Sequence, residues 1–167
     1  TLHVGREPST GEFLLTGMGE LHIRIALERL RRLYGVEAEL HTPKVPYRET
    51  ILKSADGHGR HKKQTGGRGQ FADCKIKIEP LERGAEFEFV DDIFGGAILQ
   101  NFRPAVEKGI QEARQKGFLA GNPMVDFRVR LIDGQYHDVD SSELAFKIAG
   151  SLAYKDAMAK ASPVLLE

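Results

Sequence analysis

The chain has 167 residues, of which 41% are hydrophobic and 29% charged, and its formal net charge at pH 7 is zero. These values are typical of a globular protein, and the absence of any apolar run of about 18 residues excludes a membrane-spanning helix. The first four residues contain no Met, no basic segment and no apolar segment, so we expect an internal piece of a longer protein rather than a signal peptide. Cys74 is the single cysteine, which excludes an internal disulfide and favours a reducing compartment.

The N-terminal part predicts a hairpin, a helix and a strand. Strands at 2–4 and 13–15 are joined by the turn residues of 7–12, and residues 36–40 predict a further strand. Between them, Gly35 stands where a left-handed residue would end a helix. The apolar face of that helix has helical spacing and consists of Ile23, Leu27, Leu30 and Tyr34. This set predicts half of a small α/β sandwich.

Pro43 and Pro46 favour an extended connector between this part and the next. From residue 47 onward the sequence predicts three strands, a helix, a strand and a helix. The strands are expected at 47–53, 72–79, around Phe87 and Phe89, and at 125–131; the helices are expected from Pro104 to Gly117 and from Asp140 to shortly before Pro163.

The strand at 72–79 has a regular alternation that separates an apolar face from a polar one. Asp73, Lys75, Lys77 and Glu79 are expected to face away from the core, and the apolar face consists of Ala72, Cys74, Ile76 and Ile78. Cys74 is therefore predicted to be a small core residue rather than a nucleophile. The last helix begins with a capping-box pattern in which Asp140 and Glu143 are expected to accept from backbone N–H groups.

Positive charge is concentrated in the middle of the chain. Residues 43–80 carry nine Lys or Arg against four Asp or Glu, whereas residues 1–42 carry five against six and residues 81–167 carry ten against fourteen. A locally basic segment attracts polyanions such as RNA, although a solvated strand-and-loop edge has the same composition.

The most informative stretch is the glycine-rich loop expected over residues 57–70. Glycines let a backbone approach another surface closely, and Lys, Arg, Thr and Gln can bind phosphates, riboses or base edges. The stretch is not a phosphate-binding P-loop, because no G-x-x-x-x-G-K-[ST] occurs in the chain. The alternative to an RNA-contacting loop is a flexible hairpin tip whose charge has no function. The candidate RNA-contacting residues are Arg60, Lys62, Lys63, Thr65, Gly66, Gly67, Arg68, Gly69 and Gln70.

A second polar loop is expected at 133–139, where Asp133-Gly134 is a turn signal. Its candidate contact residues are Gln135, Tyr136, His137 and Asp138. His137, Asp138, Ser141 and Ser142 could suggest a hydrolase triad, but Asp140 and Ser141 are better explained as helix-start residues.

A metal centre is a third alternative. One possible zinc site consists of His58, His61 and Cys74, but their spacing matches no standard zinc pattern. A metal-dependent enzyme would instead use His58, His61 and His137. We predict neither a catalytic residue nor a metal ligand in this chain.

Three long motifs resemble the bacterial elongation factor G family. They are Thr16-Gly17-Met18-Gly19-Glu20-Leu21-His22-Ile23, Lys62-Lys63-Gln64-Thr65-Gly66-Gly67-Arg68-Gly69-Gln70-Phe71, and Asp133-Gly134-Gln135-Tyr136-His137-Asp138-Val139-Asp140-Ser141-Ser142-Glu143-Leu144-Ala145-Phe146-Lys147. They occur in the family's order, and the resemblance covers essentially the whole chain.

The resemblance implies an α+β fold with three parts. Residues 1–43 would be the C-terminal half of the ferredoxin-like domain III, 44–162 would be domain IV, and 163–167 would begin the linker to domain V. Domain IV would be a β3-α-β-α fold like the second domain of ribosomal protein S5, with a left-handed β-α-β crossover, although ordinary chirality rules favour the opposite hand.

The resemblance also implies a function. Domain IV would enter the decoding region of the small ribosomal subunit and promote tRNA–mRNA translocation, with both polar loops against the codon–anticodon duplex and rRNA. GTP and Mg²⁺ would bind a GTPase domain that this chain lacks, so the chain itself would need no cofactor and would not be an enzyme. We expect a cytoplasmic monomer that does not bind membranes.

Some positions depart from the family pattern and leave alternatives open. Leu99 and Gln100 replace a proline and a lysine, and Asn122 replaces an aromatic residue. Such departures are typical of a diverged paralogue, for example one specialised for ribosome recycling. A tetracycline ribosomal-protection relative is the remaining alternative, although those proteins generally have different tip loops.

Overall fold

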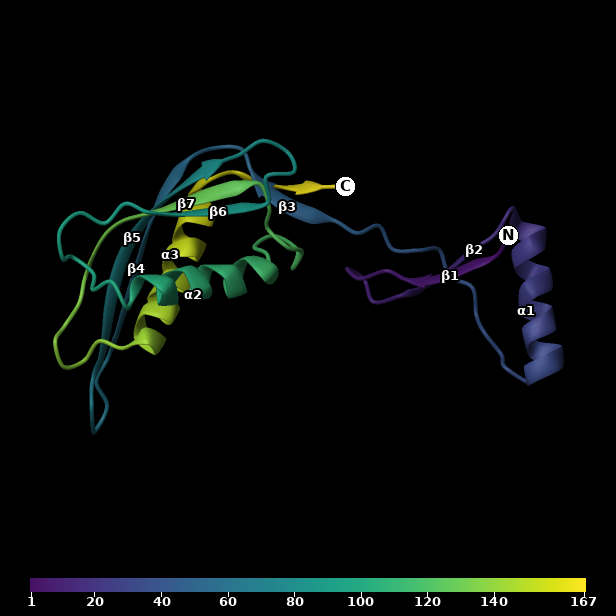
Figure 1. Cartoon of the computed structure of the whole chain (residues 1–167), viewed down its shortest axis with the longest axis horizontal. Helices are drawn as coiled ribbons and strands as arrows, with labels where there is room; N and C mark the ends of the chain where they lie inside the picture. The colour runs from purple at the N-terminus through teal and green to yellow at the C-terminus, as the bar shows by residue number, and fades with distance from the viewer. The chain divides into compact units, whose positions relative to one another are not determined.

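The computed structural model describes all 167 residues and divides them into two compact units, Thr1–Pro46 and Tyr47–Glu167 (Figure 1). Both units mix helices and strands, which confirms the predicted α+β class. No helix in the chain has the length and apolar character that crossing a lipid bilayer requires.

The first unit contains the predicted hairpin and helix. Strands β1 (His3–Arg6) and β2 (Phe13–Thr16) pair antiparallel, and α1 spans Glu20–Tyr34. Gly35 ends the helix as predicted, with a left-handed φ of 65° and its N–H donating to the carbonyl oxygen of Arg31 at 3.0 Å.

The strand predicted at 36–40 is wrong, because these residues form no strand. Alternating apolar residues become a strand only when a neighbouring strand supplies hydrogen-bond partners, and β1 and β2 pair only with each other. The apolar face of α1 is only partly covered: Ile23, Leu27 and Leu30 are half-buried, Tyr34 is 74% exposed, and no α1 residue is fully buried.

The second unit is built on a four-stranded sheet with the order β4-β5-β7-β6. Neighbours are antiparallel except β6 and β7, which are parallel and are joined through α2. The predicted β-α-β crossover is therefore present, and its left hand stays a prediction. The elements are β4 (Ala55–Lys63), β5 (Gln70–Pro80), β6 (Phe87–Asp91), α2 (Arg103–Gln115), β7 (Phe127–Gln135) and α3 (Glu143–Lys160).

A small second sheet pairs β3 (Arg48–Ile51) with β8 (Pro163–Leu166) in antiparallel register. Strand β3 was predicted from the sequence, whereas β8 and β4 were not. The residues of β4 resemble a loop in sequence, because its inward positions are Gly57 and Gly59 and its other residues are mostly charged, so no apolar alternation is visible.

The core lies between the sheet and the two helices. Helix α3 packs on β4 and β5, and α2 packs on α3 (Figure 1). The predicted apolar face of β5 is confirmed, since Ala72, Cys74, Ile76 and Ile78 are all fully buried. Asp73, expected to face outward, is also buried, because both of its carboxylate oxygens lie within 2.9 Å of the His58 ring.

Two glycines of β4 allow α3 to rest directly on the strand. A Cβ at Gly59 would fall on the carbonyl oxygen of Ala149, and one at Gly57 on that of Ala153. On the helix side, this contact is made by Ala149, Ala153 and Ala157, all fully buried. Gly57 and Gly59, which the sequence analysis included in a surface loop, therefore serve close strand–helix packing.

The start of α3 also differs from the capping box that was predicted. Ser142, not Asp140, is the N-cap, and its Oγ accepts from the N–H of Ala145 at 3.1 Å. The carbonyl oxygen of Asp140 accepts instead from the N–H of Phe71 at 2.9 Å, so the chain before the helix is fixed to β5.

A buried carboxylate fixes the loop that follows α2. Glu49 is fully buried and accepts hydrogen bonds from the backbone N–H groups of Phe118, Leu119, Ala120 and Asn122. These four donors replace the water that the carboxylate loses on burial, so the single side chain connects β3 to the 117–122 loop.

Adding one methyl group at the contact between α3 and β4 should destabilise the second unit. We expect Gly59→Ala to lower the free energy of unfolding by about 1–3 kcal/mol, because either the helix or the strand must move to admit the Cβ. Urea denaturation followed by circular dichroism measures this. Gly67→Ala is the matched control, since a Cβ there meets only the Thr65 carbonyl oxygen at 3.9 Å; equal stability of the two variants would contradict the packing argument.

Burial raises the pKa of the Cys74 thiol to about 12, with the adjacent carboxylate of Asp73 acting in the same direction. The thiol ionises near pH 8.5 in the unfolded chain. Because the folded state holds the thiol proton more tightly than the unfolded chain does, the thiol's contribution to the free energy of unfolding is fully present below about pH 8.5. It is lost as the pH rises toward 12. At pH 8 we expect iodoacetamide to alkylate Cys74 roughly 1,000-fold more slowly than in urea. A cysteine placed at exposed Ser9 is the control, and rapid alkylation of native Cys74 would refute its burial.

Candidate nucleic-acid interface

Two loops far apart in sequence meet at one end of the second unit. The first is the tip of the β4–β5 hairpin, residues 64–69, and the second is the β7–α3 loop, residues 136–142. Ser141 joins them: its Oγ accepts from the His137 N–H and donates to the Phe71 carbonyl oxygen, each at 2.8 Å. Together with the Phe71–Asp140 backbone bond, this holds the second loop against the base of the hairpin tip.

Two further contacts fix the tip itself. The Arg68 guanidinium donates to the carbonyl oxygen of Val139 at 3.0 Å. Gly69 lies so close to Asp140 that a Cβ would come within 3.0 Å of the carboxylate. The two predicted loops therefore form one continuous surface, which we call the tip surface and define as residues 60–71 and 135–141.

The tip surface has a hollow of about 330 Å³. Cationic, amide and aromatic side chains line it, a combination that can bind phosphates, ribose hydroxyls and bases. The lining residues are Lys62, Lys63, Gln64, Gln70, Phe71, His137 and Asp140.

Phe71 is the aromatic centre of this hollow. The Arg60 guanidinium lies 5.5 Å from its ring centroid, and the His137 ring meets it edge-on with the centroids 6.3 Å apart. Next to it, the Gln70 side-chain oxygen lies 2.8 Å from Nε2 of His61. These contacts orient Gln70 and His137 before any ligand binds.

The remaining predicted residues divide into an exposed group and a supporting group. Thr65, Gly66, Gly67 and Asp138 are exposed to solvent at the tips of the loops. Gln135 is also exposed but is still part of β7, paired with Asp73, whereas Tyr136 is half-buried against the core. The sequence thus identified the two loops, and the structure separates the side chains that face solvent from those that support them.

The turn predicted at Asp133-Gly134 is wrong. Strand β7 continues through both residues, which pair with Lys75 and Cys74, and a bulge between Lys75 and Ile76 absorbs the register shift. Gly134 is required there because a Cβ would strike Ile98 and the Asp73 carbonyl oxygen. The second loop therefore begins only after Gln135.

The hydrolase and metal alternatives find no support in the geometry. The Ser141 hydroxyl is occupied by two backbone groups and Ser142 by the helix N-terminus. His58 pairs with Asp73 and His61 with Gln70, and no three His, Cys, Asp or Glu residues are grouped closely enough to hold a metal ion.

Sequence reasoning missed several residues that build the site. Phe71 and Ser141 lie at its centre, but an aromatic residue at a strand start and a serine before a helix have common structural explanations. The signal that was available is the position of Phe71 directly after the basic, glycine-rich run.

Comparison with known proteins identifies the class and then the family. Residues 1–42 match the family model described as "Elongation Factor G, domain III", and residues 43–162 match "Elongation factor G, domain IV". The chain is therefore a pair of successive domains from a translation factor. It belongs to the elongation factor G family.

Relatives of known sequence and structure agree with this assignment. Over all 167 residues the chain is 58% identical to elongation factor G of Aquifex pyrophilus. A crystal structure from Thermus thermophilus is 53% identical, with a TM-score of 0.85 over 99% of the chain. The chain spans about a quarter of each relative, 24% in both cases.

Removing the Ser141 hydroxyl should loosen the second loop. We expect Ser141→Ala to cost about 1–2 kcal/mol locally, since the His137 N–H and the Phe71 carbonyl each lose a partner. Amide hydrogen exchange at His137 should accelerate by about 5- to 30-fold. Ser141→Thr, which keeps the hydroxyl, should behave more like wild type, and Ser54→Ala at an exposed position is the control. Unchanged exchange in Ser141→Ala would show that the hydroxyl does not fix the loop.

Proposed function

We propose that the second unit is the arm of a translational GTPase that promotes tRNA–mRNA translocation on the ribosome. The tip surface would enter the decoding region of the small subunit and contact the codon–anticodon duplex and nearby rRNA. The observation that carries this proposal is the joining of both polar loops into one preorganised surface by Ser141 and Arg68.

The chemistry of the tip surface suits a duplex of any sequence. An A-form duplex has a wide, shallow minor groove that displays 2′-hydroxyls. The glycines at 66, 67 and 69 keep the hairpin tip narrow, and Gln70 and His137 present hydrogen-bonding groups that can reach ribose hydroxyls. Lys62 and Lys63 add phosphate contacts that carry no sequence information. Recognition by shape is what a factor serving every codon requires.

The energy for translocation would come from outside this chain. We propose that the whole protein binds GTP and Mg²⁺ in a separate GTPase domain and that residues 1–167 transmit and apply the resulting movement without a catalytic residue of their own. Residues 1–43 would belong to domain III, 44–162 to domain IV, and 163–167 would lead toward domain V. The protein would act in the cytoplasm, as a monomer, on ribosomes.

The departures at Leu99, Gln100 and Asn122 lie outside the tip surface. Asn122 contributes its backbone N–H to Glu49, a contact that does not depend on its side chain. Retention of both loops therefore favours translocation, and a paralogue specialised for ribosome recycling is the competing function.

Replacing the two groups that would reach the duplex should slow translocation and spare GTP hydrolysis. In the full-length parent, we expect Gln70→Ala combined with His137→Ala to reduce the translocation rate by roughly 10- to 1,000-fold, since two hydrogen-bonding side chains are lost. Single-round tRNA–mRNA translocation on purified bacterial ribosomes measures this, beside multiple-turnover GTPase activity.

Ser54→Ala is the control variant, and it should translocate at the wild-type rate. A parallel fall in GTP hydrolysis would contradict the assignment of the tip surface to translocation. Subunit splitting is assayed in parallel: splitting without translocation by the wild-type protein would identify the recycling function.

A further inference from the structure

We propose that Phe94 is a separate RNA contact, in which its ring stacks on an unpaired base beside the duplex that the tip surface binds. This proposal rests on the proposed function, because it assumes that the same end of the second unit faces RNA. It adds a site outside both tip loops and names its ligand class, a single-stranded nucleobase.

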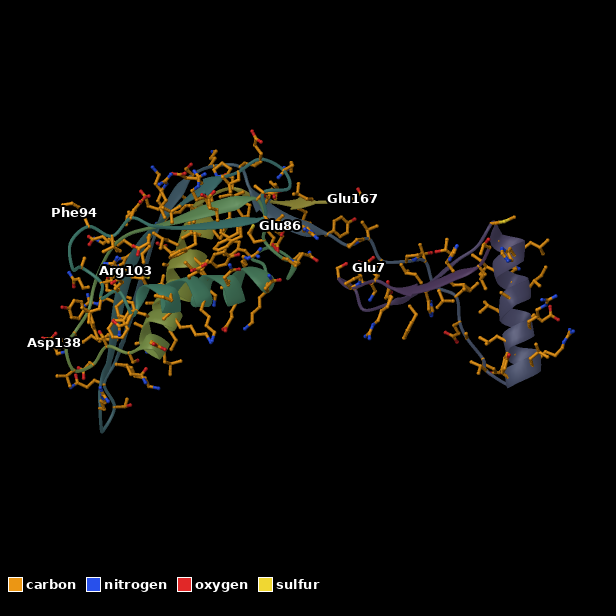
Figure 2. The ribbon with its side chains drawn as sticks, viewed as in Figure 1. Glu7, Glu86, Phe94, Arg103, Asp138 and Glu167 are labelled. Atoms are coloured by element: carbon orange, nitrogen blue, oxygen red, sulfur yellow. The ribbon has the colours of Figure 1, made fainter.

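Phe94 is the most exposed large hydrophobic side chain of the protein. It lies in the loop between β6 and α2, residues 92–102, and is 96% exposed. Figure 2 shows it projecting away from the ribbon, at the end of the second unit where Asp138 of the tip surface also lies. A ring exposed in this way is free to stack on a planar partner.

The loop that carries Phe94 is fixed on both sides of the ring. The side chain of Arg103, only 18% exposed, pairs with Asp91 at 3.0 Å and donates to the carbonyl oxygens of Ile98 at 3.1 Å and Gly95 at 3.5 Å. Ile98 is fully buried and packs where Gly134 leaves room. Because the loop is already ordered, a ligand of Phe94 would bind without the entropic cost of ordering it.

The surroundings of Phe94 favour a nucleobase over an apolar pocket of a protein. Gly95 and Gly96, which follow Phe94, have no side chains that could cover its ring, and Phe94 is 96% exposed. Anchors of protein interfaces usually stand within a packed apolar ring of neighbours, whereas base stacking needs only a bare aromatic plane.

Charge near the ring does not oppose RNA. The neighbouring carboxylates of Asp91 and Asp92 are paired with Arg103 at 3.0 Å and Arg130 at 2.9 Å. Ile98, in the same loop as Phe94, lies against Gly134 of β7. The next residue, Gln135, is the first of the second segment of the tip surface. Phe94 and Asp138 of the tip surface lie at one end of the unit, on the side where a strand leaving a bound duplex would pass (Figure 2).

The chain contains no tryptophan, so Phe94→Trp introduces a single tryptophan at the site, which can be excited selectively at wavelengths beyond the absorption of the tyrosines. The probe is a fluorescein-labelled RNA hairpin with an A-form stem and four unpaired adenosines beside it; the comparison RNA lacks the adenosines. We expect the first RNA, not the second, to quench tryptophan emission in Phe94→Trp. Phe13→Trp, at an 80% exposed position of the first unit, is the control and should not be quenched.

Fluorescein anisotropy on the same RNAs measures binding at any site. Phe94→Ala and Phe94→Leu should both weaken binding of the adenosine-bearing RNA by roughly 5- to 100-fold, because neither offers a ring to stack on. Arg68→Ala should weaken binding of both RNAs. If Arg68→Ala weakens binding while every Phe94 variant binds normally and no quenching occurs, stacking is refuted and the proposed function stands.

Two other outcomes also count against stacking. In the first, Phe94→Ala and Phe94→Trp bind purified small ribosomal subunits more weakly, Phe94→Leu binds them normally, and none of the three variants binds RNA more weakly. The partner is then an apolar pocket of a protein. If the wild-type chain binds neither RNA and Arg68→Ala does not alter its affinity for small subunits, both this inference and the assignment of the tip surface to RNA fail.

Discussion

The close contact between α3 and β4 is the constraint on which the rest of the second unit depends. Gly57 and Gly59 let the helix backbone lie directly on the strand, with alanines at 149, 153 and 157 on the helix side. Gly109 and Gly150 allow a similarly close approach between α2 and α3. Because α3 is held on both sides, the position of its first residue is fixed, and so is the loop that precedes it. Protein cores are packed too densely for such a contact to slide.

This packing gives the tip surface its rigidity. The loop of residues 136–142 ends at the Ser142 cap of α3, and the hairpin tip is the continuation of β4, so both loops extend from elements that the glycine contact holds together. Ser141 and Arg68 then close the remaining distance. Hydrogen bonds between two anchored loops supply stiffness to the tip surface with few residues.

The first unit, unlike the second, has no densely packed contact between its helix and its strands. Its hairpin and helix form from local sequence, yet no residue of α1 is fully buried. Residues 1–42 match the domain III model of the elongation factor G family, and the chain covers 24% of the relative from Aquifex pyrophilus. Local signals are enough for a helix stop at Gly35 or a two-stranded hairpin, whereas burial needs strands that another segment supplies.

The sequence by itself determined the elements with strong periodicity and the two polar loops. It predicted the buried face of β5, the helix α2 between Pro104 and Gly117, and the basic, glycine-rich run from Lys62 to Gln70, because these depend on local spacing and side-chain chemistry. Only the tertiary structure decided the roles of glycine and serine. Gly57, Gly59 and Gly134 resemble loop residues in sequence but are strand positions where another segment comes too close for a Cβ. Ser141 resembles a helix cap but joins two loops that lie 70 residues apart, since a hydroxyl takes whichever partners the fold brings to it.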